Sequence, residues 1–138
     1  MTKITLAAVL FLTGLTAQAR SVEIKCKPNP EATSAQFIMV ANLVVADDET
    51  VSGAVKYATR STATAQTSEI RTITVSGKVA VAEAGEIKIG TVTSYQLIDE
   101  SDELVRIILN PDLSGPTSST LMIDRKFRYS SQCKVVKK

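Results

Sequence analysis

The chain has 138 residues, of which 44% are hydrophobic, 4% aromatic and 22% charged, with a formal net charge of +2 and no histidine. This length is typical of one domain, and so small a net charge argues against a dedicated nucleic-acid-binding protein. The lack of histidine excludes Ser-His-Asp and Cys-His catalysis as well as histidine-ligated zinc.

The first nineteen residues have the pattern of a secretory signal peptide. Lys3 supplies the positive charge, residues 4–15 are mostly apolar, and Ala17-Gln18-Ala19 offers small residues to a signal peptidase. The apolar stretch is shorter than the roughly 20 residues that span a bilayer. We therefore expect cleavage after Ala19, export to the bacterial periplasm or the extracellular medium, and one mature domain of residues 20–138 with a net charge of +1.

The rest of the chain alternates apolar and polar residues, is rich in Val, Ile and Thr, and shows no sustained helical periodicity, so it is predicted to be all-β. Turn-forming stretches separate the strands. The predicted strands are 22–27, 36–46, 50–59, 69–82, 86–98, 104–110, 118–124 and 126–136.

Register tests three of the predicted hairpins, because apolar residues must fall on one face of each pair. In all three the odd-numbered residues face inward. The predicted pairs are Val45–Val51, Leu43–Gly53, Ala41–Val55 and Met39–Tyr57 around 47–49, Leu97–Val105 and Tyr95–Ile107 around 99–103, and Ile123–Phe127 and Leu121–Tyr129 around 124–126. A tight turn at Ser76-Gly77 fails this test, so 69–82 is predicted as one long strand with Gly77 as a bend or bulge.

Two cysteines, Cys26 and Cys133, lie on the inward faces of the first and last predicted strands. In an exported protein they are expected to form a disulfide. A bond between the first and last strands closes a meander into a ring and removes both sheet edges. The sequence therefore predicts an eight-stranded antiparallel up-and-down barrel closed by this disulfide, with a two-sheet β-sandwich as the alternative.

Several outward positions are more apolar than a barrel requires. Val92, Ile98 and Met122 are among them, but the candidate interface consists of Ile38, Val40, Val44, Leu104 and Ile108. Exposed apolar patches commonly mark contact surfaces, so these five residues are expected to lie close together and to bind a partner protein or a second copy of the chain. The alternatives are that loops or the N-terminal segment cover them, or that the strand boundaries differ from those predicted.

No catalytic, cofactor-binding or metal-binding residues are predicted. The acidic residues cluster at hairpin tips, where solvent would surround them, and the loop 99–103 lacks the glycine and the ligand spacing of an EF-hand. Basic residues gather near the C-terminus at Arg125, Lys126, Arg128, Lys134, Lys137 and Lys138, and the disulfide should bring Lys25 and Lys27 near Lys134. A solvated face is the simpler interpretation of this cluster, and an anionic partner is the alternative.

A membrane-spanning barrel is not expected. Such barrels carry an apolar outer band, aromatic girdles and a polar interior. This chain has few aromatic residues, its apolar face is predicted to point inward, and Arg71, Lys78, Lys88 and Arg106 interrupt its strands.

The stretch Ser52-Gly53-Ala54-Val55-Lys56-Tyr57, in a small exported barrel with one disulfide, resembles the Ser-Gly-x-x-Tyr loop of bacterial periplasmic inhibitors of c-type lysozyme. Here the tyrosine comes one residue later, and the tryptophan-containing companion motif is missing because the chain has no tryptophan. The resemblance implies a hydrolase inhibitor, and no functional residue is transferred from the family.

Three functions are therefore carried forward. The first is a non-catalytic binding protein that uses its outer surface or loops. The second is a carrier that encloses a small apolar ligand, since an eight-stranded barrel can be either filled or hollow. The third is the hydrolase inhibitor that the resemblance implies, and an enzyme is not expected.

Overall fold

The computed structural model describes residues 19–28, 35–61, 66–83, 91–115 and 117–137. Almost all of the predicted signal peptide and part of the fifth predicted strand, residues 86–90, lie outside these ranges. The strands are β1 (Arg20–Lys27), β2 (Gln36–Val45), β3 (Thr50–Arg60), β4 (Arg71–Glu83), β5 (Thr91–Asp99), β6 (Val105–Leu109), β7 (Ser119–Ile123) and β8 (Phe127–Lys137). The described part of the chain contains no helix long and apolar enough to cross a membrane.

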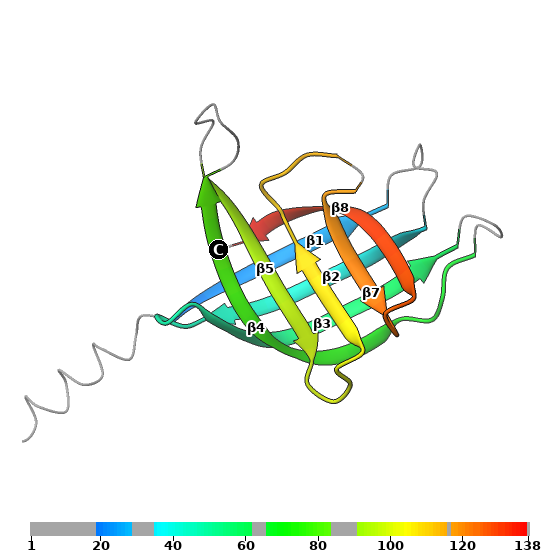
Figure 1. Cartoon of the computed structure of the whole chain (residues 1–138), viewed down its shortest axis with the longest axis horizontal. Coiled ribbons are helices and arrows are strands. Elements are labelled where there is room, and N and C mark those ends of the chain that lie inside the picture. Colours follow the sequence, from blue (N-terminus) through cyan, green and yellow to red (C-terminus); the bar gives the residue numbers. More distant parts are fainter. Residues whose placement is uncertain (1–18, 29–34, 62–65, 84–90, 116, 138) are drawn as a thin grey trace, which may run out of the picture.

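The eight strands form one closed barrel in sequence order, and β8 returns to pair with β1 (Figure 1). Every neighbour in this ring is antiparallel, with one additional parallel pairing of Gln36 on β2 with Ser130 on β8. The prediction of an up-and-down barrel is confirmed, and the sandwich alternative is wrong.

Side chains alternate between the barrel interior and the outer wall. The interior residues are mainly the even-numbered ones in β1 and the odd-numbered ones in β2 to β8. Along β2, for example, Phe37, Met39, Ala41, Leu43 and Val45 are buried, whereas Ile38, Asn42 and Val44 are exposed. This alternation follows from the pleat of a strand, which turns successive side chains to opposite faces. The buried residues form one continuous hydrophobic cluster, to which all eight strands contribute.

The β2–β3 hairpin has the predicted register, with Val45 opposite Val51 and Met39 opposite Tyr57. The β7–β8 hairpin also pairs as predicted, with Ile123 opposite Phe127. These tight connections determine which residues face each other, because a loop of fixed length permits only one pairing.

The predicted register of the β5–β6 hairpin is wrong, because the observed pairing is shifted by two residues. Leu97 pairs with Ile107 rather than with Val105, and Tyr95 pairs with Leu109. The connection is longer than predicted because Asp102 N donates to the carbonyl of Asp99, and Val105 N donates to the carbonyl of Asp102, forming two successive turns. A shift of two residues leaves every side chain on its predicted face, so burial alone does not reveal the error.

β4 runs as one long strand through Gly77, as predicted. Gly77 lies opposite Val51 on one side and Leu97 on the other. A Cβ atom here would collide with the carbonyl oxygen of Gln96, so only glycine allows β4 and β5 to approach this closely.

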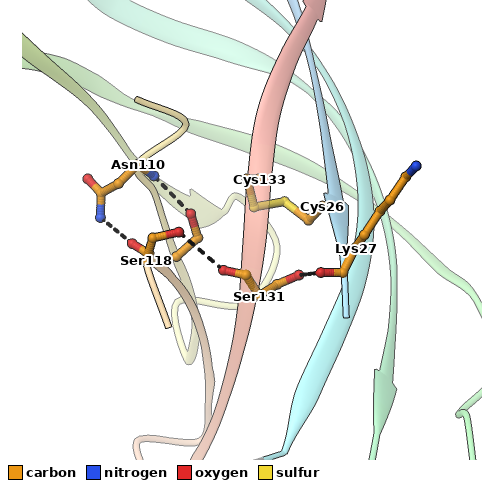
Figure 2. The surroundings of a disulfide bond; sticks show 7 residues. Cys26, Lys27, Asn110, Ser118, Ser131 and Cys133 are labelled. Carbon is orange, nitrogen blue, oxygen red and sulfur yellow. Dashed lines mark hydrogen bonds between the residues drawn. A yellow bond between two sulfur atoms is a disulfide. The ribbon is translucent and has the colours of Figure 1, made fainter. Parts of the chain in front are cut away.

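The predicted disulfide links Cys26 and Cys133, which are direct partners in the β1–β8 register (Figure 2). Both cysteines are buried in the core. Beside them, Ser131 Oγ donates to the carbonyl of Lys27 at 2.8 Å, where β1 ends. The covalent bond and this hydrogen bond together hold the seam at which the barrel closes.

Two residues predicted to face inward are exposed. Phe127, the first residue of β8, is 54% exposed, and Val81, near the end of β4, is 59% exposed, because both lie at the ends of their strands. Tyr129, the next inward residue, is partly buried against the core.

Candidate functional site

The five candidate interface residues are all at least partly exposed. Ile38 and Val44 on β2 are 37% and 44% exposed, and Val40 between them is partly buried. Leu104, just before β6, and Ile108 within it are 41% and 44% exposed.

These residues do not form a single patch. β2 and β6 stand four places apart in a ring of eight strands and so lie on opposite sides of the barrel (Figure 1). The expectation that all five lie close together is therefore not met. Ile38, Val40 and Val44 belong to one wall, and Leu104 and Ile108 belong to the other, and each group has its own polar neighbours.

The wall that contains Ile108 is hollowed by a groove of about 370 Å³ across β4, β5 and β6. We call it the β4–β6 groove. It is lined by Ser76, Gly77, Lys78, Gln96, Leu97, Ile98, Arg106, Ile107 and Ile108.

Two rows of outward side chains cross this groove. In one row Ile98 on β5 pairs with Arg106 on β6. In the next, Gln96 lies between Lys78 on β4 and Ile108 on β6. Ile98 and Ile108 are exposed apolar residues, and Lys78 and Arg106 are exposed cations. The groove therefore combines apolar surface with positive charge and contains no acidic side chain in its lining.

The opposite wall is also cationic. Lys25 on β1 is the direct partner of Lys134 on β8, as expected because the disulfide-bonded pair Cys26–Cys133 is the next pair along the same ladder. Both side chains are exposed. The prediction that the disulfide brings Lys25 near Lys134 is confirmed. Lys138 lies outside the described residues.

The acidic residues lie mainly in the connections at the two ends of the barrel. Asp48 accepts hydrogen bonds from Thr50 N at 3.1 Å and Thr50 Oγ at 2.6 Å, and these bonds lower the pKa of its carboxyl. In the β5–β6 connection Asp99 is only 4% exposed, contrary to the expectation of a solvated tip, and its carboxylate accepts from Ser101 N and Oγ. Within the described residues, no group of three or more acidic or cysteine side chains is arranged to hold a metal ion.

At the same end of the barrel, the Tyr57 hydroxyl is buried without a hydrogen-bond partner. Burial raises the pKa of Tyr57, the nearby Arg71 lowers it in part, and Asp99 and Asp102 add to the rise. Arg71 is close enough to lower the pKa of this hydroxyl, but it forms no hydrogen bond with it. A smaller polar hollow of about 250 Å³ between Thr59, Ser68 and Tyr129 offers hydroxyl groups but no ionised side chain.

The sequence already indicated the apolar half of the groove, because Ile98 and Ile108 were recognised as outward-facing. The sequence pattern identifies Lys78 and Arg106 only as charges that interrupt strands, and the structure shows that they line the groove. The signal in the sequence is their even numbering. Successive side chains of a strand point to opposite faces, so the even-numbered Lys78 and Arg106 lie on the same outer face as the even-numbered Ile98 and Ile108.

Comparison with protein family models, with curated proteins and with solved structures finds no match to this chain.

Proposed function

We propose that this chain is an exported, non-catalytic binding protein whose β4–β6 groove docks an acidic protein partner. The observation that carries the proposal is the exposure of Ile98 and Ile108 directly beside Lys78 and Arg106. Each large apolar side chain left in water forgoes about 1.5–3 kcal/mol of burial. A partner that covers both isoleucines would recover part of this free energy.

The compartment is inferred from the disulfide. A buried bond between Cys26 and Cys133 is typical of proteins that fold in an oxidising environment. Together with the signal-peptide pattern of residues 1–19, it supports the bacterial periplasm or the extracellular medium as the place of action.

Charge supports an acidic partner over a second copy of the same groove. Two copies related by a twofold axis would face each other through the same surface. Lys78 and Arg106 of one copy would then oppose the same cations of the other, at a cost in electrostatic free energy. A partner segment with carboxylates beside apolar side chains would instead complement both features of the groove.

Interior packing makes the carrier hypothesis weaker. Phe37, Met39, Leu97 and Ile107 are fully buried and belong to the same hydrophobic cluster. In an eight-stranded barrel the side chains can fill the interior completely, and this barrel contributes large ones from nearly every strand. A ligand would have to displace them.

The position of the Ser-Gly-containing stretch does not support the inhibitor hypothesis. Ser52 to Tyr57 lie within β3 rather than in a loop, and the Tyr57 side chain points into the core, where it is 3% exposed. A tyrosine in this position cannot reach the active site of another protein.

The test uses a photo-crosslinking amino acid introduced at Ile108 in the exported full-length protein. We expect one crosslinked partner, which is absent when the same amino acid replaces Ala54, an exposed residue of β3 outside the groove. The N-terminus of the recovered protein should be Arg20, as cleavage after Ala19 requires. The partner is then purified and titrated against the wild type and against the Lys78→Glu, Arg106→Glu double variant.

Charge reversal should weaken binding at least tenfold at low salt, which is about 1.4 kcal/mol, and added salt should reduce the difference. The matched control is Lys56→Glu, which changes an exposed lysine of β3 outside the groove and should bind like the wild type. Equal crosslinking at positions 108 and 54, or unchanged affinity of the double variant, would refute the proposal.

A further inference from the structure

The wall opposite the groove is formed by the outward side chains of β8, β1, β2 and β3, which we call the β2 wall. Its strands carry the exposed lysines Lys25, Lys27, Lys56 and Lys134. Among the described outward side chains of these four strands, Glu23 is the only acidic one. The wall is thus strongly positive, although the whole chain is nearly neutral.

Three of the lysines lie in one row across the four strands. Lys134 pairs with Lys25, Lys25 pairs with Val40, and Val40 pairs with Lys56. Neighbouring strands are about 4.8 Å apart, so the backbones of Lys25 and Lys134 are about 5 Å apart, and those of Lys25 and Lys56 about 10 Å. Like charges directly opposite each other on neighbouring strands are unfavourable, and a bound anion would relieve the repulsion.

No described acidic side chain forms an ion pair with this row. Among the described residues, the ion pair is between Arg20 and Glu49. Arg20 is at the start of β1, and Glu49 is in the connection between β2 and β3, so neither belongs to the lysine row. The charge of the row is therefore free to act on a partner.

Between the lysines, β2 presents apolar side chains to solvent. Ile38 is exposed, and the partly buried Val40 next to it on the same face lies between Lys25 and Lys56. The exposed Val44 lies farther along this face, beyond Asn42. Cations therefore flank a short apolar ridge. The surface of a bilayer with anionic headgroups matches both features, because basic side chains interact with the headgroups while apolar ones enter the interface.

A single-stranded nucleic acid or other stacked polyanion fits less well. Surfaces that bind such chains combine cations with several aromatic platforms. Among the described residues of these four strands the exposed aromatic side chain is Phe127, at the start of β8 and seven positions before Lys134. The apolar ridge would gain nothing from a fully hydrated polymer.

We propose that the β2 wall docks the protein on anionic lipid headgroups through Lys25, Lys56 and Lys134, with Ile38 and Val44 entering the interface. This role is independent of the β4–β6 groove, which stays exposed on the other side of the barrel. A protein anchored in this way could hold a membrane and a protein partner at the same time.

The experiment measures co-sedimentation of the mature, oxidised protein with two kinds of vesicle: phosphatidylcholine alone, and equal parts of phosphatidylcholine and phosphatidylglycerol. We expect binding only to the anionic vesicles, with loss at high salt. The Lys25→Gln, Lys56→Gln, Lys134→Gln triple variant should partition on the order of 100-fold more weakly. The double variant Lys25→Gln, Lys56→Gln should lie between the two, and it serves as the test if the triple variant does not fold.

The matched control is Lys78→Gln, Arg106→Gln, which removes two exposed cations from the groove and should leave vesicle binding unchanged. Ile38→Ser, Val44→Ser should weaken binding to anionic vesicles but not to soluble polyphosphate. The proposal is overturned if the wild type does not bind anionic vesicles at low salt, if the triple variant binds as well as the wild type, or if polyphosphate binds while vesicles do not. Each of these outcomes leaves the crosslinking test of the groove unaffected, so the two proposals fail separately.

Discussion

The carbonyl oxygen of Gln96 on β5 occupies the space that a Cβ atom on Gly77 of β4 would need. Both residues line the β4–β6 groove, so this close approach of two backbones belongs to the floor of the candidate binding surface. A single methyl group at position 77 is therefore a sensitive probe of how this wall is built.

Gly77→Ala should lower the free energy of unfolding by about 1–3 kcal/mol, because the added Cβ must push β4 and β5 apart. Urea denaturation at neutral pH measures the change. Ser76→Ala, at the adjacent outward position, should change stability by no more than about 0.5 kcal/mol. If Gly77→Ala were as stable as the wild type, the two backbones could not approach as closely as described.

Removing the disulfide should destabilise the barrel strongly. The bond spans 107 residues of sequence, and in the chain-entropy model a loop of this length contributes about 4–5 kcal/mol. Cys26→Ala, Cys133→Ala should therefore unfold at a much lower urea concentration than the wild type. A reducing agent should lower the midpoint of the wild type to a similar value and leave that of the double variant unchanged. Equal midpoints for the oxidised wild type and the double variant would show that the seam is held by the strands alone.

Tyr57→Phe should be neutral or should stabilise the protein by about 1 kcal/mol. The Tyr57 hydroxyl is buried without a partner, and a buried unsatisfied polar group costs about 1–3 kcal/mol, so its removal relieves a penalty while the ring still fills the core. Tyr57→Ala, which also removes the ring, should cost about 3–5 kcal/mol by analogy with other aromatic truncations. A loss of stability in Tyr57→Phe would instead show that the hydroxyl donates a hydrogen bond in solution.

Stability should fall at alkaline pH. Burial raises the pKa of both Tyr57 and Tyr95 above the ordinary value of 10.0. The unfolded chain then loses these protons at a lower pH than the folded protein, so the native state binds more protons above about pH 10 and the free energy of unfolding decreases there. Below that pH both states are protonated and the two tyrosines add no pH dependence. Urea midpoints between pH 8 and pH 11 check this, and the decline should be shallower in Tyr57→Phe, Tyr95→Phe.

Much of the fold could be predicted because alternation is a local property of the sequence. Whether Met39 or Val55 faces inward depends only on its position within a strand, and short loops such as 47–49 then determine the pairing. The two inward cysteines on the terminal strands added the one long-range constraint needed to predict closure, and they also brought Lys25 beside Lys134.

The candidate surfaces depended on information that alternation does not contain. Outward residues were recognised correctly, but the sequence could not tell that Ile38 and Ile108 are half a ring apart, because neighbourhood on the outer wall depends on the order in which the strands close. Nor could it place Ile98 beside Arg106. That contact depends on the β5–β6 register, which is shifted by the hydrogen-bonded turns of residues 99–105.

The sequence by itself thus determined the strands, their faces and the closing bond, because each follows from residue type and period two along the chain. The tertiary structure alone decided which outward side chains become neighbours. A shift of two residues changes no side chain's face and costs no burial, so the hydrophobic pattern cannot detect it. It nevertheless determines that Ile98 and Ile108 share the β4–β6 groove with Lys78 and Arg106.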